Sequence, residues 1–262
     1  MMSNASVPSV GLRTEIDRLF MDEFEAMDSQ YDVSVSDEAV FRQNASDQRA
    51  EVEEQFGGVG YFKRKGEAQA PDSDRGQTKY RVTYEHETWA QDLEISKELY
   101  DDDQFGFISD LVRDMAESAR ATRERNGFAV YRNAFDTAFV GGDGKALCTD
   151  DHPLIGSTGT FDNKLTLELT ETNLDTAVQA FVKMKNPRGV VHGKRPATLL
   201  VAPKKFKLAL EITKSEQRQG TPNNDLNYYS MVYPGLRVAT TPFLSDAVSG
   251  ADEDNWFLIG RT

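Results

Sequence analysis

One short segment carries the residue types that nucleophilic chemistry needs. Cys148 stands close to Asp150, Asp151 and His152, and a thiolate nucleophile requires a nearby base and a carboxylate that orients it. Residues two to four positions apart in a loop containing Gly and Pro rarely hold the fixed geometry that catalysis demands. We therefore predict an ordinary loop turn and no catalytic residue, and keep a Cys148/His152 hydrolase as the least favoured alternative.

The histidines and the glycine clusters do not predict a metal or nucleotide site. His86, His152 and His192 are scattered and lack a second cysteine or a paired HxxxH spacing. The segment 141–145 (GGDGK) lacks the six-residue interval of a phosphate loop and the Ser or Thr after its lysine. Residues 57–60 (GGVG) are not followed by a helical pattern. We expect a helix stop and turn at 141–145, hinge glycines at 57–60, and no cofactor.

A set of aromatic and basic residues lies on two segments that read as strands. It comprises Phe62, Lys63, Arg64, Lys65, Lys79, Tyr80, Arg81, Tyr84 and Trp89. Such a set could stack single-stranded nucleic acid, but the chain has 30 Lys and Arg against 43 Asp and Glu, a net charge of −13, which disfavours binding to phosphates. Aromatic residues and Arg also concentrate at protein interfaces, so we favour an inter-subunit surface. The acidic stretch Asp101, Asp102 and Asp103 is a candidate receiver for the basic hairpin of a neighbouring copy.

The first hundred residues read as a helix, an arm and a long hairpin. Apolar residues at helical spacing predict an amphipathic helix over 12–28 that must dock on another element. Residues 33–55 are polar and suit an extended arm. Strands are expected over 59–66 and 77–96, separated by turn residues. Neither face of the second strand is apolar enough for a core, so its support would be a neighbouring molecule.

The remainder combines one very long helix with a compact half. Apolar steps of three and four residues predict a helix over 103–139, roughly 55 Å long at 1.5 Å per residue if it is continuous. We expect the acidic residues 101–103 at its start, where they suit the helix dipole, and Gly106 and Gly127 could shorten or bend it. We further expect a helix capped by Thr172, a buried strand over 198–202, a helix beginning at Pro203, strands near 236–240 and 256–259, and an exposed loop over 214–227.

Composition bounds the class of protein. A chain of 262 residues with 39% hydrophobic residues can form a real core. A single cysteine cannot form an internal disulfide, and the first ten residues lack the basic and apolar blocks of a secretory signal. We therefore expect synthesis inside the cell. Apolar runs fall short of the ~20 residues that cross a bilayer, so we expect no membrane insertion.

The order of arm, hairpin, long helix and compact domain resembles tailed-bacteriophage major capsid proteins with the Hong Kong 97 fold. Local segments are similar too: Leu147–Pro153 (LCTDDHP), Asn163–Leu165, Thr172–Leu174, Pro196–Pro203 and Asp254–Leu258. The resemblance implies an α+β fold with an N-terminal helix and arm (1–55), an extended β-hairpin loop (56–98), a peripheral domain with the spine helix (99–164) and an axial domain (165–262). Members usually continue past the late strand, so we expect that the chain is truncated at Thr262.

The same resemblance implies a structural role and no enzymatic activity. Copies of the chain would form hexamers and pentamers of an icosahedral head around double-stranded DNA, assembled in the cytoplasm of a bacterial host. Portal, scaffolding and decoration proteins would be partners, and DNA would be contacted only non-specifically. The lysine–asparagine cross-link of some members is not carried over, because no residue here matches its motif. An encapsulin-like nanocompartment shell, which encloses cargo proteins, is the nearest alternative.

Overall fold

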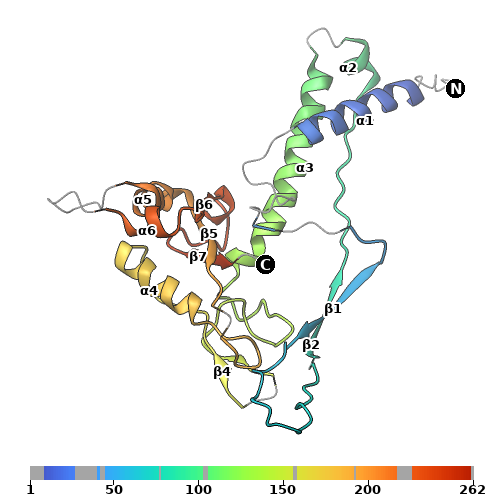
Figure 1. The fold of residues 1–262 in the computed structure, drawn as a ribbon. Coiled ribbons are helices and arrows are strands. Elements are labelled where there is room, and N and C mark those ends of the chain that lie inside the picture. Colours follow the sequence, from blue (N-terminus) through green and yellow to red (C-terminus); the bar gives the residue numbers. More distant parts are fainter. Residues whose placement is uncertain are drawn as a thin grey trace. The chain divides into compact units, whose positions relative to one another are not determined.

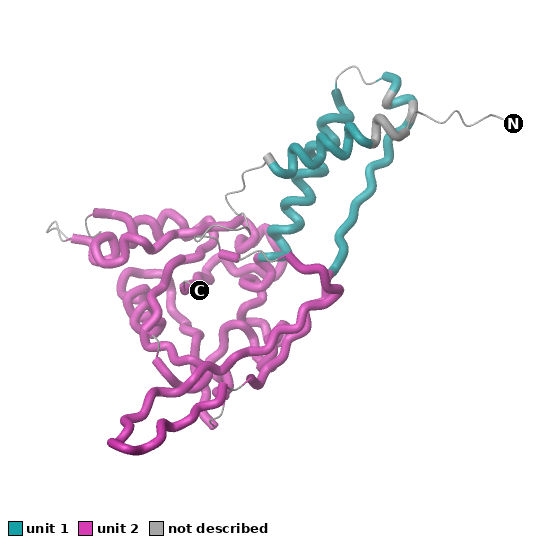
Figure 2. The backbone as a smooth tube through the Cα atoms, turned by 45° about the vertical axis from the view of Figure 1, so that its right-hand side comes forward, with its two compact units in different colours: residues 1–33, 87–127 teal, residues 34–86, 128–262 magenta. Residues whose placement is uncertain are grey.

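The computed structural model describes residues 9–26, 40–41, 45–76, 78–102, 106–155, 158–191, 193–216 and 226–260. They form a mixed α+β fold of two compact units (Figures 1 and 2). One unit joins residues 1–33 to 87–127, and the other joins 34–86 to 128–262. Among the described helices, none is long and apolar enough to cross a membrane.

The first unit is helical. It contains α1 (Ser9–Ala26), α2 (Lys97–Asp101) and most of α3 (Phe107–Arg132). The guanidinium of Arg113 donates to Glu23 over 3.0 Å, and Arg120 donates to the carbonyl oxygen of Phe24 over 3.2 Å. The N-terminal helix therefore docks on α3, as its apolar stripe requires. Residues 27 and 28, the expected end of α1, lie outside the described residues.

Helix α3 is shorter than its sequence pattern indicates. It covers 26 residues, roughly 39 Å at 1.5 Å per residue, whereas the pattern predicts 103–139. At its start, Gly106 has a φ of 72°, which a continuous helix cannot contain. At its end, Asn133 and Asp136 accept turn-type backbone bonds of 3.0 and 3.1 Å, and such residues favour turns over helix interiors. The predicted position of the acidic stretch is also wrong, because Asp101 and Asp102 end α2 and do not begin α3.

The hairpin pairs β1 (Ala50–Phe56) with β2 (Thr78–Glu85). The strands are antiparallel, with Glu51 opposite Tyr84 and Glu54 opposite Arg81. The predicted first strand, 59–66, is therefore wrong: those residues are irregular, and the strand lies in the segment read as an arm. Both faces of the ribbon are mostly exposed, so β1 needs no apolar alternation. Its acidic residues therefore gave no strand pattern in the sequence. The exposure of both faces of β2 confirms the prediction that neither of them is packed in a core.

The compact core is built around β5 (Pro196–Val201), the central strand of a three-stranded sheet. It pairs in parallel with β6 (Arg237–Thr240) and antiparallel with β7 (Trp256–Gly260). Helices α4 (Glu171–Val182) and α5 (Pro203–Lys214) pack against this sheet. The buried cluster comprises Leu169, Leu174, Val178, Leu199, Val201, Ala209, Tyr229 and Leu236. Pro203 begins α5 as expected, whereas Thr170, not Thr172, caps α4.

The opposite face of the sheet packs on aromatic rings. Leu200 and Phe257 are cross-strand partners and so share a face, and the Phe257 ring lies 5.2 Å from Tyr131 and 5.8 Å from Phe135. Phe41 joins the same cluster, 5.7 Å from Tyr131. Part of the segment predicted as a free arm is therefore packed within the chain. The remaining elements are β3 (His152–Pro153), β4 (Thr160–Phe161), α6 (Tyr228–Val232) and a short 3-10 helix (Pro242–Leu244).

Candidate inter-subunit site

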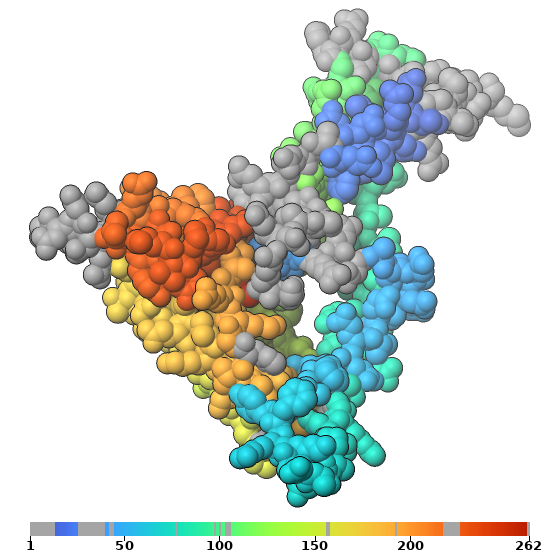
Figure 3. Space-filling view, viewed as in Figure 1, coloured from blue at the N-terminus to red at the C-terminus, as the bar shows by residue number. Residues whose placement is uncertain are grey.

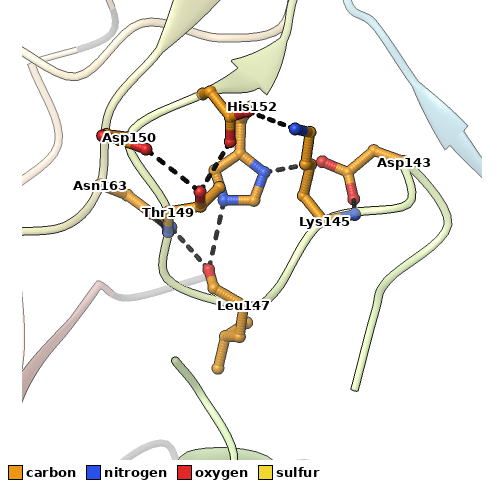
Figure 4. A network of polar contacts seen from close by, with 8 residues as sticks. Asp143, Lys145, Leu147, Thr149, Asp150, His152 and Asn163 are labelled. Atoms are coloured by element: carbon orange, nitrogen blue, oxygen red, sulfur yellow. Dashed lines mark hydrogen bonds and ion pairs between the residues drawn. The ribbon is translucent and has the colours of Figure 1, made fainter. Parts of the chain in front are cut away.

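The histidine of the candidate nucleophilic segment is engaged in a structural network. In β3, His152 Nδ1 lies 2.6 Å from an Asp143 carboxylate oxygen, and Nε2 lies 3.3 Å from the Leu147 carbonyl oxygen (Figure 4). The imidazole ring also stacks on Phe161 with 4.8 Å between centroids. Both ring nitrogens are thus directed at groups other than Cys148, so the imidazole is not placed to act as its base.

The same network braces the loop on both sides of the histidine. Asn163 accepts from the Thr149 amide over 2.8 Å and donates to the Leu147 carbonyl over 2.8 Å. Lys145 forms an ion pair with Asp151, and this hydrogen bond holds the pKa of Asp151 below its ordinary value. These contacts join residues that are distant in sequence across an irregular loop. They hold the loop turn that the sequence predicts.

Cys148 has the environment of a structural thiol. It is half-buried, and burial raises its pKa to about 11 from the ordinary 9.0. A thiolate is the reactive form, and this environment suppresses it. Across the described part of the chain, no three His, Cys, Asp or Glu side chains gather as a metal site would require. His192 lies outside the described residues.

The loop between β1 and β2, residues 57–77, is clasped to a distant turn. Arg188 Nη2 donates to both Asp74 carboxylate oxygens over 3.1 and 3.2 Å. The Gly60 amide donates to Asp74 over 2.7 Å, and the Val191 amide donates to the Tyr61 hydroxyl over 3.0 Å. The Gly60 hydrogen bond and the Arg188 guanidinium both hold the pKa of Asp74 below its ordinary value. The base of the loop is therefore held by its own chain.

The turn at 141–145 approaches strand β2 of the hairpin closely at Gly142. A Cβ atom added at Gly142 would lie 2.4 Å from Val82 Cγ2 and 3.5 Å from Tyr80 Cβ. Glycine is therefore needed here for contact with the ribbon. The turn predicted at 141–145 is present, with the Gly141 amide donating to the Lys145 carbonyl over 2.7 Å. The expected helix stop is wrong, because α3 ends at Arg132.

Beyond this clasp the loop is turned to solvent. Figure 3 shows the loop, in cyan, at the surface of the molecule. Phe62 is 101% exposed, and Lys63, Arg64 and Lys65 are exposed as well. The Lys63 ammonium lies 2.8 Å from Asp72, and this hydrogen bond raises its pKa. The loop thus presents an uncovered aromatic ring followed by basic residues.

The other members of the predicted surface occupy separate elements. Tyr80 is half-buried on β2, whereas Arg81 and Tyr84 are exposed there. Trp89 is 66% exposed and lies with the exposed Asp101 and Asp102 in the first unit. Asp103 lies outside the described residues.

Sequence reasoning missed the residues that hold the loop. Asp74 and Arg188 are 114 positions apart, and neither stands in a motif. Tyr61 was part of the expected strand but was not singled out. Only their tertiary contacts identify them, although the glycines at 141–142 did mark a turn.

Comparisons with known proteins agree with the architecture. A family model described as phage capsid protein matches residues 79–261. The structure is similar to a chain from the procapsid of bacteriophage JBD30, with a TM-score of 0.62, 16% identity, and coverage of 91% of this chain and 100% of that one. It is also similar to a chain from the JBD30 capsid decorated with minor capsid protein trimers, with a TM-score of 0.60, 12% identity, and coverage of 92% and 100%.

A third likeness is to a chain of the bacteriophage JBD30 capsid, with a TM-score of 0.58, 13% identity, and coverage of 76% of this chain and 88% of that one. No curated protein sequence matches. The structural likenesses support the fold, and the family model covers well over half of the chain. The chain therefore belongs to the phage capsid protein family and is a structural subunit of a bacteriophage capsid.

Proposed function

We propose that this chain is the major capsid subunit of a tailed bacteriophage, with the Hong Kong 97 fold, that forms hexamers and pentamers of an icosahedral head around double-stranded DNA. Residues 56–98 would then be the extended loop, 99–164 the peripheral domain and 165–262 the axial domain. The observation that carries the proposal is the β1–β2 ribbon and its loop, whose exposed faces bury little apolar surface within the chain.

Physical chemistry supports contact between copies at this ribbon. An isolated two-stranded ribbon is marginally stable in water, so contact with a neighbouring copy would stabilise it. The proposed interface residues of the hairpin are Phe62, Lys63, Arg64, Lys65, Tyr80, Arg81 and Tyr84. Trp89, Asp101, Asp102 and Asp103 are the other members of the predicted set. Contacts that are individually modest become strong when repeated around a closed symmetric shell.

The charge of the chain suits a wall around packed DNA. A net charge of −13 disfavours strong adhesion to phosphates, so DNA would be enclosed and contacted only non-specifically. One similar capsid is decorated with minor capsid protein trimers, and by analogy we propose decoration, portal and scaffolding proteins as partners. The subunit itself would carry no catalytic activity, and assembly would take place in the cytoplasm of a bacterial host.

Electron microscopy of purified protein tests this function. Wild-type chains should form closed polyhedral particles, and the triple variant Lys63→Glu/Arg64→Glu/Lys65→Glu should remain unassembled with unchanged circular dichroism. The matched control reverses the charge of three exposed lysines elsewhere, Lys183, Lys185 and Lys207, and should assemble. Monomers under all conditions would contradict the proposal. Particles that enclose protein cargo and no nucleic acid would instead indicate a nanocompartment.

A further inference from the structure

A groove is lined by β7, the edge strand of the three-stranded sheet. Its volume is about 790 Å³, and its wall includes Phe135, Leu165, Phe181, Met184 and the whole of β7. That size falls within the range of sites that bind ligands or peptides. The groove lies entirely within the second compact unit, between the end of α4, the segment 162–168 and β7.

Strand β7 is an unusual edge. The sheet order is β6-β5-β7, so within the described residues only one side of β7 is paired. Its sequence from Trp256 to Gly260 is WFLIG and contains no charge, although exposed edges are normally protected by charged residues or Pro. An apolar edge strand beside a groove has the features of a site for strand addition, in which backbone hydrogen bonds give affinity and pockets hold alternate side chains.

The rim of the groove favours a basic occupant. Four carboxylates, Asp162, Glu168, Asp252 and Asp254, line it together with one lysine, Lys164. Asp254 is already paired with Lys205 over 3.1 Å, which leaves three acids against one base. A segment that joins an apolar side chain to positive charges would match this lining.

The chain itself contains such a segment. Phe62 is fully exposed, and it is followed by Lys63, Arg64 and Lys65. Among the described contacts, none involves a backbone amide of these four residues. The clasp at Gly60 and Tyr61 ends just before them, so the clasp can persist while the segment binds elsewhere. Four extended residues cover roughly 13 Å, which fits beside a five-residue strand of roughly 16 Å.

We infer that residues 62–65 of one subunit add as a short strand to the edge of β7 in a neighbouring subunit, with the Phe62 ring in the groove and Arg64 and Lys65 at its acidic rim. This inference rests on the proposed assembly function and names the acceptor. It replaces the acidic stretch at Asp101 and Asp102 as the receiver of the basic segment, because the groove combines carboxylates with a recess that can hold an aromatic ring.

Thiol cross-linking between two different single-cysteine variants tests the contact. The native Cys148 lines the groove, so every variant carries Cys148→Ala. One chain then carries Lys63→Cys, which keeps the Phe62 ring, and the other carries Leu165→Cys, a groove position that is 42% exposed. The two chains are mixed before assembly, one of them labelled with ¹⁵N, and oxidised in the particle. A heterodimer can then form only between subunits, and mass spectrometry identifies the peptide pair that joins residues 63 and 165.

The matched control replaces Lys63→Cys by Met231→Cys, an α6 position that is 63% exposed. We expect at least about tenfold more heterodimer from the Lys63→Cys mixture, because proximity raises effective thiol concentration. The addition of Asp101→Lys/Asp102→Lys should leave that yield unchanged. Two outcomes would overturn the inference and leave the assembly function standing. In one, the heterodimer yield in the particles equals that of the Met231→Cys control. In the other, Asp101→Lys/Asp102→Lys lowers the yield to that of the control. Absence of wild-type particles would overturn both the inference and the assembly function.

If the cysteine variants do not assemble, a peptide titration decides the question. Trp89→Phe leaves Trp256, in the groove wall, as the single tryptophan. A synthetic peptide of residues 57–66 should shift its emission saturably, and the same peptide with Ser in place of Phe62 should bind at least about tenfold more weakly, as expected for loss of a buried aromatic anchor. Equal binding of the two peptides would overturn the inference.

Discussion

The β5-centred core and the β1–β2 ribbon belong to one compact unit but differ in what holds them. Every residue from Thr198 to Val201 is buried, and the strands that flank β5 are fixed by packing on both faces. The ribbon instead has mostly exposed side chains on both faces and is held to the rest of the unit by the Arg188–Asp74 clasp and the Gly142 contact. The core can be stable within one chain, whereas the ribbon has its apolar surface available to another.

The comparison separates two kinds of side chain in a capsid subunit. Core residues should change the free energy of unfolding when substituted, and ribbon residues should change assembly while folding is retained. Four measurements, from the largest expected effect to the smallest, test this separation.

Leu199→Ala should have the largest effect on folding. Leu199 is completely buried, and a Leu→Ala change in a core costs about 2–5 kcal/mol through lost transfer energy and a residual cavity. Val59→Ala, at a loop position that is 49% exposed, should change the free energy of unfolding by less than about 0.5 kcal/mol. Urea unfolding of both variants measures the two changes in the free energy of unfolding. Similar changes would contradict the proposed difference between core and loop residues.

Thiol labelling should differ by about two orders of magnitude between the regions. Burial raises the pKa of Cys148 to about 11 from 9.0, so at pH 8 its thiolate fraction is about 100-fold lower than that of an ordinary thiol. Phe62→Cys in a Cys148→Ala chain should react at the ordinary rate. Labelling of Cys148 should rise tenfold per pH unit up to its pKa; a plateau near pH 9 would show that the thiol is not suppressed.

Gly142→Ala should destabilise the junction between ribbon and core. Its new methyl group would meet Val82 Cγ2 at 2.4 Å, and overpacking of this kind costs about 1–3 kcal/mol. Gly235→Ala is the matched control, because a Cβ atom there meets no described atom within 4 Å. Thermal unfolding of both variants gives the comparison. Equal melting temperatures would mean that the ribbon shifts freely away from the turn.

Arg188→Ala should loosen the loop with little change in global stability. Hydrogen exchange of the peptide covering 57–76 should become faster, while exchange in β5 stays constant. The pKa of Asp74 is lowered from 3.8, so the clasp is fully present above pH 3.8 and is lost as pH falls through the lower folded value. Acid should therefore loosen the wild-type loop only below about pH 4, and the effect should be smaller in the variant, where Asp74 keeps only the hydrogen bond from the Gly60 amide. Arg188→Lys serves as the conservative control.

Much of the core was predictable because its signals are local. The alternation of apolar residues, Pro203 at a helix start and the run at 198–202 each depend on neighbours in sequence, and the expected helices and strands of this half are present within a few residues. The same reasoning from local patterns did not find the first strand of the ribbon. This strand carries the exposed Glu53 and Glu54 and is exposed from Val52 to Phe56, so burial imposes no apolar pattern on it.

Composition and near neighbours were enough to establish the acidic charge, the broad order of elements and the absence of a convincing catalytic motif. The folded chain was needed to show that His152 contacts Asp143 and Leu147, that Asp74 pairs with Arg188, and that β7 borders a groove. Each of these joins groups whose proximity results from chain folding, and the energy of burial, not local preference, selects which distant residues meet.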